Sequence, residues 1–153
     1  MSHAGQNEAR GLLLLRWMVG GLWIVAGCWK VQHVPDVRLF FATLRGVPRG
    51  WIDALTYVAS AVEIGLGSTL AVGWKRERFA LISLVLVGIM TVIKALWPRR
   101  GGDPVRICSC YPVLPGWKHW PLSWQRAWEY AGNVALLCGS TLLWRLALNR
   151  QAK

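Results

Sequence analysis

The residues best suited to chemistry are the two cysteines of Cys108-Ser109-Cys110, which lie in a polar, proline-containing stretch between two apolar runs. A disulfide across a single residue closes a small ring in which the preferred Cα separation and dihedral angle are hard to reach. Such strained disulfides have raised reduction potentials and exchange readily. Arg99, Arg100 and Arg106 are close in sequence and would stabilise a thiolate. The pattern favours electron transfer or disulfide exchange, with a structural disulfide or two free thiols as the alternatives.

Metal binding is a third interpretation of the same tripeptide. A structural zinc ion takes four ligands, and only His119 and the more distant His33 are available to join the two thiols. Each histidine is more typical of a polar residue at a membrane interface than of a ligand. We therefore predict no metal site.

The other two cysteines lie in apolar runs. Val25-Ala26-Gly27-Cys28 resembles a bacterial lipoprotein cleavage box. However, Arg16 interrupts the preceding apolar stretch and bulky and charged residues follow, so we predict an uncleaved first helix. Cys28 could exchange with the tripeptide, or it is a small packed residue. Cys138 lies mid-run and is expected in the core.

Glu63 is the second residue that could take part in chemistry, because it lies near the middle of an apolar run. A carboxylate at that depth in a membrane is costly and is a functional-site hypothesis. Its helical neighbours Ser60 and Gly67 are small, so we expect it to face other helices. Lys30 and Lys94 are its candidate charge partners. Glu63 would accept a proton during thiol oxidation or contact a quinone headgroup, or the ion pair would only fix helix register.

Four apolar runs place these residues in a membrane protein. Hydrophobic residues make up 54% of the 153-residue chain, and the mean hydropathy is +0.34. A hydrocarbon core of ~30 Å needs ~20 helical residues, and lipid leaves no water for unpaired backbone groups. We predict an all-α integral membrane protein, a four-helix transmembrane bundle with spans at residues 12–30, 54–74, 79–97 and 127–148.

Small residues predict how the second run packs. Ala61, Gly65 and Thr69 repeat every four residues, as do Gly67 and Ala71. Small residues at this spacing let helix backbones approach each other in membranes. The second helix is therefore expected at the centre of the bundle.

A short amphipathic helix is predicted between the first two spans. After Pro35, apolar residues fall at helical spacing on one face, and polar residues take the other. The segment is too short to span, so we expect an interfacial helix whose aromatic residues point into the acyl region. The apolar residues of this face are Val37, Phe40, Phe41 and Leu44.

The charge pattern fits a membrane surface better than a nucleic acid. The net charge of +11 comes from residues at the ends of the apolar runs and in short loops, where they anchor helices to anionic headgroups. Most of the eleven Trp residues lie at predicted helix ends, as in interfacial aromatic belts. We predict a bacterial inner-membrane, multi-pass protein with cytoplasmic termini, comprising a disordered tail (1–11), one transmembrane domain (12–148) and a C-terminal tail (149–153). Cys108 and Cys110 would then face the oxidising side.

Several short motifs resemble a known superfamily. Arg16 to Gly20, and Ala26-Gly27-Cys28-Trp29-Lys30, resemble the opening of DoxX-like proteins, and Glu63-Ile64-Gly65-Leu66-Gly67 is similar to their second-helix signature. The Cys-x-Cys between the last two helices is similar to the MauE branch, the methylamine-utilisation membrane proteins. That branch usually has Gly between the cysteines and Phe-Gly after them, whereas this chain has Ser109 and Tyr111-Pro112.

The resemblance implies a membrane protein that supports thiol–disulfide chemistry. By carry-over, Cys108 and Cys110 match the redox pair, and Lys30 and Glu63 match the intramembrane polar positions. Electrons or disulfides would pass between a periplasmic thioredoxin-like or substrate protein and a membrane acceptor, for which a quinone is the candidate. The alternative is a non-catalytic accessory or assembly subunit of a larger membrane complex.

Overall fold

The computed structural model describes residues 3–43, 47–96 and 122–151, and within them the chain is helical apart from short connections. The described part of the chain contains no strand. Its elements are α1 (His3–Gln32), α2 (Val34–Thr43), the short 3-10 helix η1 (Arg49–Trp51), α3 (Ile52–Val72), α4 (Arg76–Leu96) and α5 (Leu122–Gln151).

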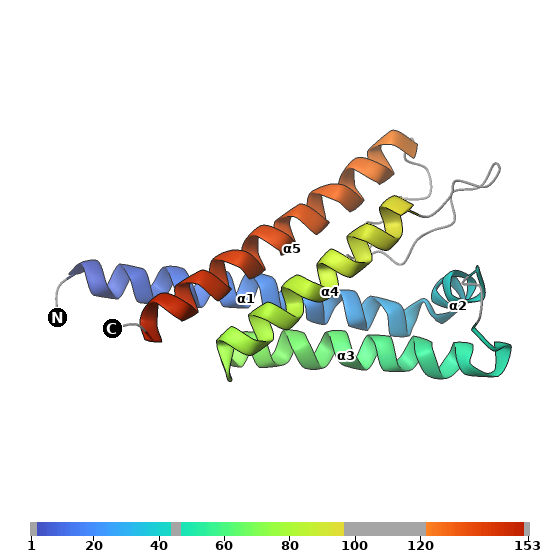
Figure 1. Ribbon diagram of the computed structural model, residues 1–153, viewed down its shortest axis with the longest axis horizontal. Helices are drawn as coiled ribbons and strands as arrows, with labels where there is room; N and C mark the ends of the chain where they lie inside the picture. Colours follow the sequence, from blue (N-terminus) through green and yellow to red (C-terminus); the bar gives the residue numbers. More distant parts are fainter. Residues whose placement is uncertain (1–2, 44–46, 97–121, 152–153) are drawn as a thin grey trace.

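The long helices form two antiparallel pairs. α1 packs along α3, and α4 packs along α5 (Figure 1). Both chain ends lie at one end of the molecule, whereas α2 and the start of α3 lie at the other (Figure 1). The α4–α5 pair crosses the α1–α3 pair obliquely, and the two pairs diverge toward the end where α4 stops and α5 begins (Figure 1).

Three of the described helices are long and apolar enough to cross a membrane. The segments are Arg10–Gln32, Arg49–Val72 and Tyr130–Asn149, and they correspond to the first, second and fourth predicted spans. The predicted third span, 79–97, falls on the 21-residue α4, and Trp97 lies outside the described residues. That α4 also spans the membrane remains a prediction.

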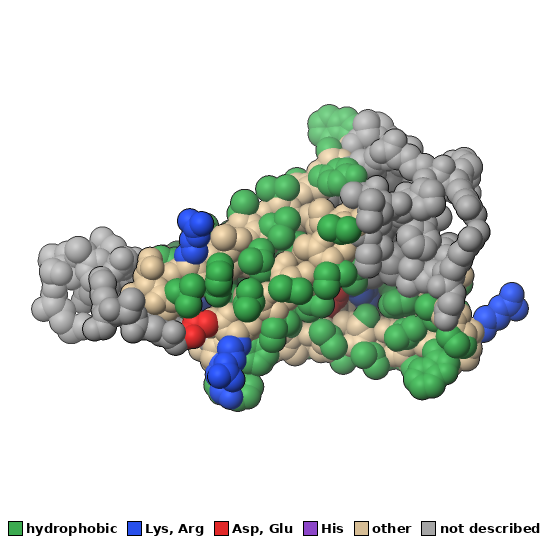
Figure 2. Space-filling model, in the orientation of Figure 1, with side chains coloured by type: hydrophobic (Ala, Val, Ile, Leu, Met, Phe, Trp, Pro, Cys, Tyr) green, Lys and Arg blue, Asp and Glu red, His purple; other side chains and the backbone are tan. Residues whose placement is uncertain are grey.

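The outer surface agrees with a lipid environment. Hydrophobic side chains are spread along the whole described face shown in Figure 2, and the exposed Lys and Arg side chains lie mainly toward its two ends. Large exposed residues such as Met18, Val58 and Val85 would be costly to present to water. In a bilayer the same residues contact acyl chains.

α1 begins earlier than predicted. It starts at His3, whereas the sequence predicts a disordered tail over residues 1–11. The segment before the apolar run includes Ala4, Glu8 and Ala9, all good helix formers. The helix therefore continues from the apolar run into this segment.

Glycines bring α1 and α3 into close contact. A Cβ atom on Gly67 would lie 2.5 Å from the carbonyl oxygen of Gly20, and one on Gly20 would lie 2.6 Å from that of Gly67. Further along α1, a Cβ on Gly27 would lie 2.8 Å from the carbonyl oxygen of Ser60 on α3. No side chain fits at these crossings, so backbone packs on backbone, as small residues allow in membranes.

The predicted small-residue stripe is only half correct. Gly67 and Ala71 are buried against α1, but Ala61 and Gly65 are exposed, and a Cβ on Gly65 would meet nothing within 4 Å. Both sets have four-residue spacing, and they lie on different faces of α3. Spacing alone does not say which face meets a partner helix.

Polar side chains tie the helices together at two levels. Near the chain ends, Arg16 donates from Nε to the carbonyl oxygen of Leu70 (3.2 Å) and from Nη2 to that of Ala71 (2.7 Å). These bonds satisfy carbonyls that the end of α3 leaves unpaired. Gly73 closes that helix in the left-handed region, at φ 82°.

The second level links α1 to the other helix pair. The indole Nε1 of Trp23 donates to Ser83 Oγ on α4 at 2.8 Å, and Ser83 Oγ lies 2.7 Å from Ser140 Oγ on α5. All three side chains are buried. The chain of hydrogen bonds therefore joins α1, α4 and α5 inside the bundle.

α2 occupies the segment for which the sequence predicts an amphipathic helix. Val37, one residue of the predicted apolar face, is buried within the protein at 2% exposure. Arg38 binds Asp53 of α3 through two contacts, Nε to Oδ1 at 2.5 Å and Nη2 to Oδ2 at 2.6 Å. α2 is thus attached to α3, and its location at a membrane interface remains a prediction.

Alanine substitutions should affect stability differently on the two faces of α3. Gly67→Ala places a Cβ against the α1 backbone and is expected to cost about 1–3 kcal/mol of unfolding free energy. Gly65→Ala meets open space and should be neutral or stabilising by up to about 1 kcal/mol. Denaturation of the purified variants in detergent micelles measures both, and equal stability of the two would contradict this packing.

Candidate functional site

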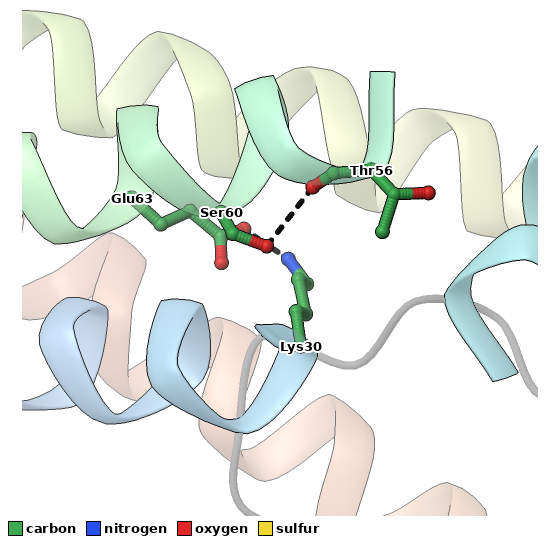
Figure 3. A network of polar contacts seen from close by, with 4 residues as sticks. All are labelled: Lys30, Thr56, Ser60 and Glu63. Carbon is green, nitrogen blue, oxygen red and sulfur yellow. Dashed lines mark hydrogen bonds and ion pairs between the residues drawn. The ribbon is translucent and has the colours of Figure 1, made fainter. Parts of the chain in front are cut away.

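The most unusual feature of the bundle is a buried ion pair between α1 and α3. Lys30 Nζ contacts Glu63 Oε1, and the two side chains are only 0% and 6% exposed (Figure 3). Of the two candidate partners predicted for Glu63, Lys30 is therefore in contact with it. The side chain of Lys94 lies outside the described residues.

The helix register brings these two side chains together. Gly27 meets the backbone of Ser60, and Lys30 and Glu63 each lie three residues beyond that crossing in their own helices. Because the helices are antiparallel, the two Cα atoms are displaced in opposite directions. Side chains lean toward the N-terminus of their helix, so each leans back toward the crossing and they meet there.

Two hydroxyl groups of α3 belong to the same polar region. Ser60 Oγ donates to the carbonyl oxygen of Thr56 at 2.9 Å, and Thr56 Oγ1 donates to that of Ile52 at 2.9 Å. In Figure 3 the Ser60 hydroxyl lies beside the point where Lys30 and Glu63 meet. Sequence reasoning missed Thr56, although it lies seven residues before Glu63 and so on the same helix face.

The ion pair lies in the apolar interior of the bundle, where burying a charge costs free energy. Moving an ion into a low-dielectric interior costs several kcal/mol after relaxation, and only a well-placed partner offsets this. Polar residues within membrane spans are typically found on functional pathways. Chemically, the carboxylate of Glu63 can accept a proton and the ammonium of Lys30 can donate hydrogen bonds to an oxygen acceptor.

Asn133 of α5 is another buried polar side chain that sequence reasoning missed. It is 1% exposed, and it lies seven residues before Ser140 on the same helix. The signal available in the sequence was an Asn within an apolar run, because such a residue seldom faces lipid.

The predicted redox cysteines lie outside the described residues. Cys108, Cys110 and His119 belong to segment 97–121, which follows α4 and precedes α5. Both of those helix ends are at the end of the bundle where α1 terminates just after Lys30 (Figure 1). The topology therefore attaches the cysteine-bearing segment to the half of the bundle that holds the ion pair.

The remaining cysteines do not pack inside the protein. Cys28 and Cys138 are both exposed, which corrects the prediction that Cys138 is in the core. The buried face of α5 carries Leu136, Gly139 and Ser140, and Cys138 projects to one side of it. In a bilayer both thiols would face lipid.

The described residues offer no group of three or more His, Cys, Asp or Glu that could hold a metal ion. His33 follows the last residue of α1, with its ring stacked on Trp29 at 4.4 Å between centroids. Its Nδ1 lies 3.0 Å from the carbonyl oxygen of Trp29. Its contacts are local to the end of α1.

These features define a class: an all-helical membrane protein whose bundle encloses a Lys–Glu pair. The family model for the methylamine utilisation protein MauE matches residues 9–147, nearly the whole chain, and the protein belongs to that family. The resemblance seen in the short motifs is thereby confirmed. No curated protein and no solved structure matches the chain.

Removing the charge of one member of the pair should lower the free energy of unfolding more than removing both charges. Lys30→Met leaves Glu63 buried without its cation and is expected to cost about 3–5 kcal/mol. The double variant Lys30→Met/Glu63→Leu should be less destabilised than Lys30→Met alone. Lys75→Met, at an exposed turn position, is the control and should change stability by about 0.5 kcal/mol or less.

Chemical denaturation of these variants and of the single variant Glu63→Leu in one detergent gives these values. If the effects of Lys30→Met and Glu63→Leu simply add in the double variant, the two side chains do not interact.

Proposed function

We propose that the protein is a membrane thiol–disulfide redox protein that acts as an accessory factor in methylamine utilisation. Membership of the MauE family supports this role, and the family's description supplies the process. The observation that carries the redox proposal is the buried Lys30–Glu63 pair, located in the half of the bundle to which the Cys108–Cys110 segment is attached.

The proposed reaction has two balanced parts. A dithiol of a periplasmic thioredoxin-like or substrate protein attacks the Cys108–Cys110 disulfide, so that the partner becomes a disulfide and Cys108 and Cys110 become thiols. These thiols then reduce a membrane quinone to quinol, transferring two electrons and two protons and restoring the disulfide. The protein is unchanged overall, and the partner's dithiol is oxidised.

Glu63 and Lys30 would serve the proton transfers. Oxidation of two thiols releases two protons, and a carboxylate within the bundle can accept one when few other bases are available. Lys30 contacts Glu63 and offsets part of the cost of burying its charge. Placement in the inner membrane with cytoplasmic termini puts Cys108 and Cys110 on the periplasmic side, where disulfides persist.

A non-catalytic assembly subunit is the second candidate function. The exposed small-residue face of α3 supports it, because Ala61 and Gly65 leave room for the backbone of another helix. Such a subunit would not depend on Cys108 or Cys110.

Thiol trapping tests the redox proposal. In intact cells, maleimide-polyethylene glycol should label Cys108 and Cys110 only after reduction, because the resting pair is a disulfide. Cys108→Ser and Cys110→Ser should each hold the oxidised form of the partner as a mixed disulfide, because the one remaining thiol attacks the partner's disulfide and lacks the second cysteine that would complete the exchange. Each variant should also abolish the oxidation of the reduced partner, because no Cys108–Cys110 disulfide is left for that partner to attack.

Cys28→Ser and Cys138→Ser are matched controls with the same chemical change on lipid-facing positions. They should retain activity and trap nothing. Free labelling of Cys108 and Cys110 without reductant, together with full activity of Cys108→Ser, would refute the redox function and favour the assembly subunit.

A further inference from the structure

Polar residues form a row along one face of α3. Asp53, Thr56, Ser60 and Glu63 are spaced by three or four residues, so they share a helix face. Thr56, Ser60 and Glu63 are 0%, 1% and 5% exposed, and Figure 3 shows Thr56 on the far side of Ser60 from Glu63. The side chain of Asp53 is 55% exposed. This polar row therefore leads from the buried ion pair to the start of α3, where it reaches the surface of the protein.

α2 covers the outer end of the polar row. The contacts of α1 with α3 define an antiparallel register, in which Gly20 meets Gly67. Seven residues further along α1, Gly27 meets Ser60, which lies seven residues earlier in α3. Continuing by seven more residues places Asp53 opposite position 34, where α1 has ended and α2 has begun. The first turn of α3 thus has α2, which packs against it, as its neighbour on this face.

A short connection separates α2 from α1. Only His33 lies between the two helices, and Pro35 in the first turn of α2 has no N–H with which to continue the hydrogen bonds of α1. The ring of His33 is stacked on Trp29 and so belongs to the end of α1. α2 can therefore change its angle to α1 without disturbing the contact of α1 with α3.

The described side chains of α2 include one that is fully buried and one that forms an ion pair. Val37 is 2% exposed, and Arg38 binds Asp53 through side chains that are 50% and 55% exposed. Ion pairs this exposed contribute little to stability, and a helix of ten residues is marginal on its own. An element with few buried contacts opens at a lower free energy than the rest of a protein.

We propose that α2 is a lid over the polar row, closed in this structure, and that its opening admits water to Thr56, Ser60 and Glu63. The purpose of the lid rests on the proposed function, because a proton accepted by the buried Glu63 has to leave for water. The hydroxyl groups of the polar row can bind that water. In the proposed orientation α2 lies on the periplasmic side, so the proton leaves on the side where the thiols of the partner are oxidised.

Hydrogen–deuterium exchange of the full-length protein in nanodiscs, followed by mass spectrometry, tests whether α2 opens. In the wild type, amides of α2 should exchange about tenfold faster or more than those of α1 and α3 at the glycine contacts. Asp53→Asn should speed the exchange of α2 by a further factor of about two to five, which corresponds to the loss of an exposed ion pair. Arg38→Gln removes the same ion pair from α2 and should have the same effect.

Glu77→Gln is the control for the loss of an acidic charge. Like Asp53, Glu77 lies in the first turn of its helix. Both substitutions therefore remove one negative charge and its favourable interaction with the helix dipole. Because Glu77 is at the start of α4, Glu77→Gln should leave the exchange of α2 unchanged.

Thiol labelling tests whether the lid covers the polar row. Thr56→Cys introduces a thiol of similar size into the row, and mass spectrometry follows its alkylation by a charged, water-soluble maleimide. Adding Arg38→Gln should raise the labelling rate about two- to fivefold, because the lid opens more often. Val58→Cys, at an exposed position of α3, is the control, and its labelling rate should be the same with and without Arg38→Gln.

Exchange of α2 as slow as that of α1 would overturn the lid, and so would equal effects of Glu77→Gln and Asp53→Asn. A labelling rate of Thr56→Cys that Arg38→Gln does not change would overturn it too, because α2 would then not cover the row. Neither measurement needs redox activity. A protein that passes both tests and traps no partner keeps the lid and loses the redox function, whereas one that traps its partner and fails either test loses the lid alone.

Discussion

The rest of the structure depends on the close approach of α1 and α3. Gly20, Gly27 and Gly67 allow the two backbones to touch, and this contact sets the register of one helix against the other. The register brings Lys30 to Glu63 and Arg16 to the last carbonyls of α3. Without it, a carboxylate and two cations would have to be accommodated separately in an apolar environment, at a cost of several kcal/mol each.

The two helix pairs are held together differently. α1 and α3 touch along much of their length, whereas α4 and α5 join them through a narrower contact that includes the Trp23–Ser83–Ser140 link (Figure 1). Away from this contact the pairs diverge toward the end that bears segment 97–121. The contact between the pairs also includes apolar core residues from all four long helices, such as Val19, Leu70, Val87 and Leu143.

The sequence predicts much of this fold because the strongest signals are local. Apolar runs longer than about 18 residues have few alternatives to membrane-crossing helices, and a Glu inside such a run needs a partner. The sequence narrows that partner to Lys30 or Lys94, and the structure shows the contact with Lys30. The faces of α3 were harder to predict, because Gly65 and Gly67 are equally small and only the position of α1 distinguishes them.

The inward-facing polar residues share a spacing, including Thr56 and Asn133, which sequence reasoning missed. Arg16, Trp23 and Lys30 follow one another at seven-residue intervals in α1, as do Thr56 and Glu63 in α3 and Asn133 and Ser140 in α5. Thr56 and Ser140 alone are unremarkable in an apolar run, and Trp23 resembles a lipid-facing aromatic. The interval has meaning only when helices from distant parts of the chain are aligned, which requires long-range contacts that a local pattern does not contain.

The positions of Arg16 and Lys30 also constrain how the chain is made. Both cations are in the first helix, and the groups that bind them are in α3, 54 and 33 residues further along the chain. While α1 is being inserted, its cations have to reach the headgroups by extending along the helix. α1 therefore attains its final depth and tilt only after α3 has left the ribosome, and biogenesis of the bundle starts from the first two spans, which are made one after the other with only α2 and η1 between them.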